Sequence, residues 1–137
     1  MRFTSGWVLL LLFSLSACQP TAVSQPARLL LQSDPLEVWI APGNIPVEYP
    51  LQLTLALQQP VQQIQAEITG LSMYMGRIPL RFTRLDTLQS DWTEQWQAEF
   101  LLGACSDPQM KWQLKLTVLY QSGEQVELIQ TFSSSWK

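Results

Sequence analysis

The stretch YPLQLTLALQ, residues 49–58, decides the fold class, because apolar and polar side chains alternate along it with a period of two. Such alternation is typical of a β-strand that turns one row of side chains to a core and the other to solvent. Six further stretches show the same period, and they centre on residues 36–40, 64–68, 78–82, 96–102, 112–120 and 126–132. The chain is therefore expected to form about seven short strands.

Turn residues separate these strands, among them Pro42-Gly43 and Ser122-Gly123, and no stretch shows the period of an amphipathic helix. One apolar face per strand predicts an all-β fold, an antiparallel two-sheet sandwich of immunoglobulin-like type. The cysteine pair and intervening core tryptophan of immunoglobulin domains are not reproduced, so the pattern predicts the class and leaves the strand order open.

The N-terminus has the features of a targeting segment. Arg2 precedes the apolar run 7–13, which is too short to span a bilayer, and Leu15-Ser16-Ala17-Cys18 follows. This LSAC sequence resembles the lipobox of bacterial lipoproteins. The resemblance implies cleavage before Cys18 and its modification by a diacylglyceryl thioether and an N-linked acyl chain such as palmitate. An ordinary secretory signal is the alternative.

The same resemblance suggests a location and a domain organisation. By the sorting rule of the family, Gln19 rather than Asp after the cysteine places the protein on the periplasmic face of the outer membrane, rather than the inner one. Residues 1–17 would be the signal peptide, 18–28 the lipidated cysteine and a flexible spacer containing Pro20 and Pro26, and 29–137 the β-sandwich domain. The acylated Cys18 would bind the bilayer, since several acyl chains together give stable anchoring.

Composition restricts the classes of function. The 137-residue sequence has no histidine, which excludes hydrolases that rely on a histidine base or on histidine ligands to zinc. Arg2 is the only charged residue before Cys18, so the mature chain keeps seven basic and eleven acidic residues, a net charge of −4. This balance gives no basic footprint for nucleic acid. We expect a binding or accessory protein and not an enzyme.

Two methionines follow the strand centred on residues 64–68. Met73 and Met75 stand two residues apart in the segment GLSMYMG, so both thioethers would lie on one side of an extended chain. A straight extension of the strand would turn them outward, whereas a bulge at Gly70 would turn them inward. They could also simply fill gaps at a sheet edge, as methionine often does.

A second sulfur-containing segment precedes the strand at 112–120. Cys105 in GACSDPQM is the only thiol left once Cys18 is acylated, so it has no disulfide partner within the chain. It could be a buried small apolar side chain, could form an intermolecular disulfide, or could bind a metal. Met110 closes the same segment.

Topology can bring the two segments together. In a seven-strand sandwich the third and sixth strands are antiparallel neighbours, so the end of the third lies beside the start of the sixth. Met73, Met75, Cys105 and Met110 would then gather at one end of the molecule, with Asp107 as the nearby carboxylate. One thiolate with thioethers is a soft ligand set that favours Cu(I) over zinc, calcium or magnesium.

A second resemblance covers about half of the mature chain. GLSMYMGRIPL (70–80), the strand around Trp96, GACS (103–106) and Met110-Lys111-Trp112 are similar to small proteobacterial envelope lipoproteins associated with Sco-type copper-assembly systems. The resemblance implies Cu(I) binding or delivery, and a partner among the envelope proteins of that pathway. The alternative is a structural or protein-interaction lipoprotein without metal, which uses an exposed sheet edge or the loop around Tyr74.

Overall fold

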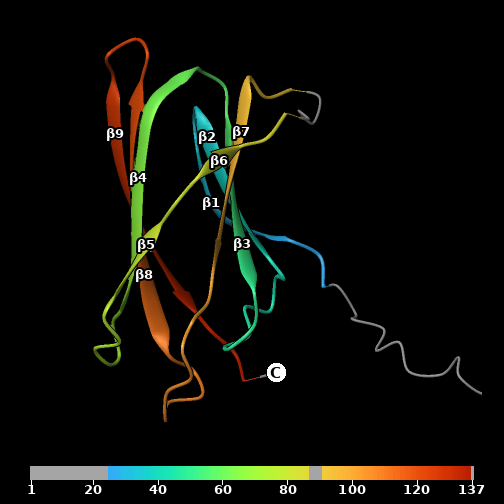
Figure 1. Ribbon diagram of the computed structural model, residues 1–137, viewed down its shortest axis with the longest axis vertical. Coiled ribbons are helices and arrows are strands. Elements are labelled where there is room, and N and C mark those ends of the chain that lie inside the picture. The colour runs from blue at the N-terminus through green and yellow to red at the C-terminus, as the bar shows by residue number, and fades with distance from the viewer. Residues whose placement is uncertain (1–24, 87–90, 137) are drawn as a thin grey trace, which may run out of the picture.

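The computed structural model describes residues 25–86 and 91–136 (Figure 1). These residues form an all-β structure with strands and no helix. The predicted signal peptide and Cys18 lie outside the described residues. In the described part of the chain there is no helix long and apolar enough to cross a membrane.

Two antiparallel sheets make up the described structure. The first sheet has the strand order β1-β2-β3-β7-β6, and the second has the order β5-β4-β8-β9. The bounds of the first are β1 Arg28–Ser33, β2 Leu36–Ala41, β3 Leu51–Leu57, β7 Glu94–Phe100 and β6 Thr83–Arg84. Those of the second are β5 Arg77–Leu80, β4 Val61–Gly70, β8 Lys111–Tyr120 and β9 Gln125–Ser133. The predicted sandwich class is confirmed, and all seven predicted strands are present alongside β1 and β6.

The core lies between the sheets and is built from the apolar rows that the alternation predicts. In β3 the side chains of Leu51, Leu53 and Leu55 are fully buried. The facing sheet contributes the even-numbered residues of β8, beginning with Trp112 and Leu114, which are buried to the same degree. Burying a large apolar side chain stabilises a fold by about 1.5–3 kcal/mol, so these two rows are a main source of stability.

The predicted pairing of the third and sixth strands is observed as β4 with β8. The register runs from Val61 opposite Tyr120 to Gly70 opposite Trp112, with one irregularity between Val61 and Gln63. The last residue of β4 therefore lies beside the first residues of β8. Whatever follows β4 and precedes β8 is held at one end of the sandwich.

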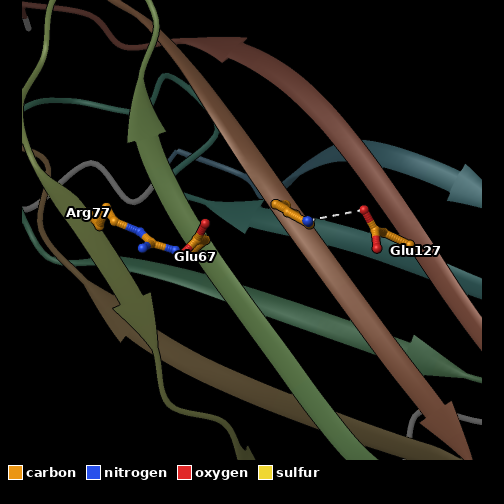
Figure 2. Close-up of polar contacts among 4 residues, drawn as sticks. Glu67, Arg77 and Glu127 are labelled. Carbon is orange, nitrogen blue, oxygen red and sulfur yellow. Dashed lines mark hydrogen bonds and ion pairs between the residues drawn. The ribbon is translucent and has the colours of Figure 1, made fainter.

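The outer face of the second sheet is charged. Glu67 of β4 accepts a hydrogen bond from Arg77 Nε of β5 at 3.0 Å, and Lys115 of β8 pairs with Glu127 of β9 at 3.2 Å. Figure 2 shows Arg77, Glu67 and Glu127 on this face. Exposed ion pairs of this kind contribute about 0–1 kcal/mol each, so this face is mainly a solvated surface.

One carboxylate is buried between the sheets. Glu94 of β7 is on the inner face, because it pairs with Leu57 and continues the row that contains Trp96. Its Oε2 accepts hydrogen bonds from Trp96 Nε1 at 2.9 Å and from the backbone N–H of Val61 at 3.3 Å, and Arg84 lies 3.5 Å from Oε1. Since Val61 belongs to the opposite sheet, this carboxylate links the two layers.

Tyr120 at the end of β8 generates a stability prediction. Its hydroxyl is buried without a hydrogen-bond partner, and burial, with a smaller contribution from Glu124, raises the pKa of Tyr120 above the usual 10.0. Because the folded state holds this proton more tightly than the unfolded state, its contribution is intact below pH 10 and is lost as pH rises through the folded pKa. Removing an unpaired buried hydroxyl is close to neutral.

We therefore expect Tyr120→Phe to change the free energy of unfolding by less than about 1 kcal/mol at pH 7 and to reduce the loss of stability above pH 10. Urea unfolding at both pH values measures this. Tyr74→Phe, at a side chain that is 84% exposed, is the matched control and should behave as wild type. A loss of alkaline stability equal in wild type and Tyr120→Phe would contradict the assignment.

Candidate metal centre

Two segments meet at the end of the sandwich where β4 finishes and β8 begins. Residues 71–76 connect β4 to β5, and residues 101–110 connect β7 to β8 (Figure 1). The backbone N–H of Leu71 donates to the carbonyl of Lys111 at 2.8 Å, and the N–H of Lys111 donates to Ser72 Oγ at 3.0 Å. These bonds hold the first loop against the start of β8.

The loop after β4 takes neither of the two paths considered from the sequence. The strand neither continues straight nor bulges at Gly70; it ends there, and the chain folds back over this glycine. A Cβ at Gly70 would lie 2.2 Å from the carbonyl oxygen of Met73 and 2.5 Å from the terminal methyl of Met110. Glycine is needed because only a residue without Cβ permits this close approach.

The turn exposes the two methionines to different degrees. Met73 is 45% exposed, whereas Met75 is half-buried. Gly76, at φ +78°, then leads into β5. Met73 is therefore partly open to solvent, whereas Met75 is more covered.

Cys105 and Met73 are in direct contact. The Cys105 Sγ lies 3.7 Å from the Met73 Sδ, and the backbone N–H of Asp107 donates to the same Sγ at 3.3 Å. Cys105 is 9% exposed and forms no disulfide with any described residue. Two sulfurs each about 2.3 Å from one metal ion lie roughly 4 Å apart at tetrahedral or trigonal angles, so this separation suits a shared ion.

The other two predicted ligands occupy the same end with different surroundings. The methyl group of Met75 lies 3.2 Å from the position of a Cβ at Gly103, two residues before Cys105 in the chain. Met110 is 1% exposed, and its methyl packs against Gly70 beneath the loop. Contact of the Met75 and Met110 sulfurs with Cys105 stays a prediction, and the packing makes Met110 part of the core.

The carboxylate near the sulfurs, that of Asp107, forms a hydrogen bond within its own turn. Asp107 Oδ1 accepts a hydrogen bond from the N–H of Gln109 at 2.9 Å, which closes an Asx turn within the 101–110 segment. Among residues 25–86 and 91–136, no three His, Cys, Asp or Glu side chains come together as metal ligands. The donors that converge are a thiol and a thioether, a soft pair suited to Cu(I).

Sequence reasoning missed the polar groups that support these sulfurs. The Ser72 hydroxyl holds the loop, and the N–H of Asp107 holds the thiol. Neither a loop serine nor a backbone amide changes the alternation of apolar and polar residues, so the sequence pattern does not predict these contacts. Gly70 is the available sequence signal for the turn, but a glycine at this place in a strand pattern equally predicts a bulge.

Comparison with known proteins yields a fold-level likeness. No family model matches the chain, and no curated protein matches it at a significant level. A crystal structure of a DUF4426 family protein from Pseudomonas aeruginosa PAO1 is similar, with a TM-score of 0.51, 11% identity, and coverage of 80% of this chain and 94% of that one. At this identity the likeness supports the β-sandwich fold and carries nothing about function.

Gly70→Ala tests the geometry of the loop. Because the added methyl meets a backbone carbonyl, we expect a loss of about 1–3 kcal/mol in the free energy of unfolding, measured with urea. Gly103→Ala is the control, since its added methyl meets only the flexible end of Met75 at 3.2 Å. Equal losses in the two variants would show that the fold-back over Gly70 is not the constraint described.

Proposed function

We propose that this chain is a membrane-anchored periplasmic lipoprotein whose sandwich binds Cu(I) through sulfur and serves as a binding or delivery accessory protein. The observation that supports the proposal is the 3.7 Å contact between Cys105 Sγ and Met73 Sδ, in a buried setting next to the protein surface. Met75 lies in the same loop as Met73 and would supply a further thioether, whereas Met110 lies in the core beneath that loop and its predicted role as a ligand is tested below.

The chemistry assigns different tasks to the two sulfurs in contact. Cys105 would lose its proton when it binds Cu(I), and the N–H of Asp107 that already donates to Sγ would stabilise the thiolate. Met73 is neutral and half exposed, so it would bind the ion from the solvent side. Cu(I) is here the cargo, and an exposed thioether is the ligand most easily exchanged for one of a partner.

The partner in delivery would be an envelope protein of a copper-assembly pathway, as the resemblance of residues 70–80 and 103–106 implies. The second candidate is a protein-interaction lipoprotein without metal. Tyr74 supports it, because this side chain is 84% exposed at the tip of the loop and large aromatic side chains are common anchors in interfaces.

Competitive titration of Cu(I) against a chromogenic chelator, under anaerobic conditions, tests the metal site. The acylated chain in detergent is the sample, because Cys105 is then the one free thiol. We expect a single Cu(I) in wild type and an affinity at least about 100-fold lower in Cys105→Ser, equivalent to about 2.7 kcal/mol. Met73→Leu should lower the affinity by about tenfold.

Met110→Leu is the control variant for these measurements. It keeps the volume of a buried side chain while removing a sulfur, so a small effect would mark Met110 as core and a large one as a ligand. Circular dichroism verifies that each variant is folded. Wild type that binds Cu(I) no more tightly than Cys105→Ser would refute the metal site and leave the protein-interaction function.

A further inference from the structure

Six of the eight exposed large apolar side chains of the described residues lie at one end of the sandwich, and the other two, Leu29 and Ile129, lie on the strands β1 and β9. Those six come from the β2–β3 loop, the β4–β5 loop, the β7–β8 segment and the tail after β9. They are Tyr49, Leu71, Met73, Tyr74, Leu101 and Trp136. We call this set the apolar end.

Backbone hydrogen bonds join the segments that carry these side chains. The N–H of Glu48 donates to the carbonyl of Leu102 at 2.8 Å, and the N–H of Val47 donates to the carbonyl of Ser135 at 3.1 Å. The N–H of Leu71 in the β4–β5 loop donates to the carbonyl of Lys111, the first residue after the β7–β8 segment. The loops and the tail therefore form one connected surface, which lies at the lower end of the molecule in Figure 1.

The outer faces of the sheets have a different character. The second sheet presents ion pairs, and Ile129 is its one strongly exposed large apolar residue among those described. The first sheet presents a polar ladder in which Gln97 donates to Gln52 at 3.1 Å and Gln52 donates to Glu99 at 3.2 Å. An apolar partner would therefore meet the molecule at the apolar end.

The tether to the predicted lipid enters at this same end. The carbonyl of Pro26 accepts a hydrogen bond from the N–H of Gly43 at 3.0 Å, and Arg28 of β1 pairs with Ile40, near where β2 leads into the β2–β3 loop. Seven residue steps separate Cys18 from Gln25. At about 3.5 Å per step they span at most about 25 Å, so this end is held close to the bilayer.

We propose that the apolar end docks on the surface of the bilayer to which Cys18 is attached. Tyrosine and tryptophan favour the boundary between headgroups and acyl chains, and leucine favours the apolar side of it. The mature chain has fewer basic than acidic residues, so docking relies on these apolar contacts rather than on attraction to anionic lipid. The proposal rests on the acylation of Cys18 and does not require that the chain binds copper.

Tryptophan fluorescence of the acylated chain, reconstituted into phosphatidylcholine vesicles, tests the docking. We expect vesicles of dibrominated phosphatidylcholine to quench part of the emission, and Trp136→Phe to remove most of that quenchable part. Leu71→Asp combined with Leu101→Asp should reduce the quenching at least twofold. Ile129→Asp, at a residue 57% exposed against 56% for Leu101, is the matched control and should leave it unchanged.

The possible results separate the proposals. Equal emission in plain and brominated vesicles would overturn the docking. So would a loss of quenching in Ile129→Asp as large as that in the variant with Leu71→Asp and Leu101→Asp. No quenching, together with a Trp136 emission that shifts as the protein density is raised, would assign the apolar end to contacts between copies and would also overturn the docking. Mass spectrometry of the same sample reports acylation: a chain without acyl groups overturns anchor and docking together, whereas an acylated chain without quenching overturns docking alone.

Discussion

The pairing of β4 with β8 is the constraint on which the rest of this structure depends. Its register puts Ile68 opposite Leu114 and Gly70 opposite Trp112, with the apolar side chains of both strands on the inner face. A slip of one residue would turn that whole row to solvent, so burial fixes the register strongly. Because β4 ends at Gly70, the register also fixes where the loop with Met73 lies relative to the segment with Cys105.

Two sets of hydrogen bonds add to the stability that the apolar core provides, one at each end of the sandwich. Glu94 accepts hydrogen bonds within its own sheet and from Val61 of the other, at the end of the sandwich away from the sulfurs. At the sulfur end, Ser72 and Lys111 join the loop to β8. A buried carboxylate without such partners would be strongly destabilising, so the bonds explain how Glu94 stands among apolar residues.

The period of two predicted seven strands because each has one buried and one solvated face. It did not reveal β1, where Leu29, Leu30 and Leu31 are consecutive and a register shift between Leu29 and Leu31 breaks the alternation. It also missed β6, a pair of exposed residues in which no apolar row exists. The alternation around residues 78–82 conceals the point where the chain leaves β5 and crosses to the other sheet.

The candidate site was predictable to the extent that topology decides it. Neighbouring strands brought Met73 to Cys105, as antiparallel pairing requires, but the fold-back over Gly70 depends on tertiary contacts with Met110 that no local pattern encodes. The burial of Met110 has the same origin. Topology brings the four sulfurs to one end, and packing then leaves Met73 partly exposed beside the buried Cys105 while it encloses Met110 in the core.

The sulfur pair and the apolar end share one loop, and this has a physical consequence if both proposals hold. Met73 lies between Leu71 and Tyr74, so a bilayer in contact with these side chains would also cover the thioether on the open side of the site. Exchange of Cu(I) would then be confined to the undocked state. A ligand that requires one of two states shifts the balance between them by its difference in affinity, and the same coupling acts in both directions. Binding of a copper partner would therefore compete with the bilayer for this loop, which would tie metal transfer to detachment of the sandwich from the lipid surface.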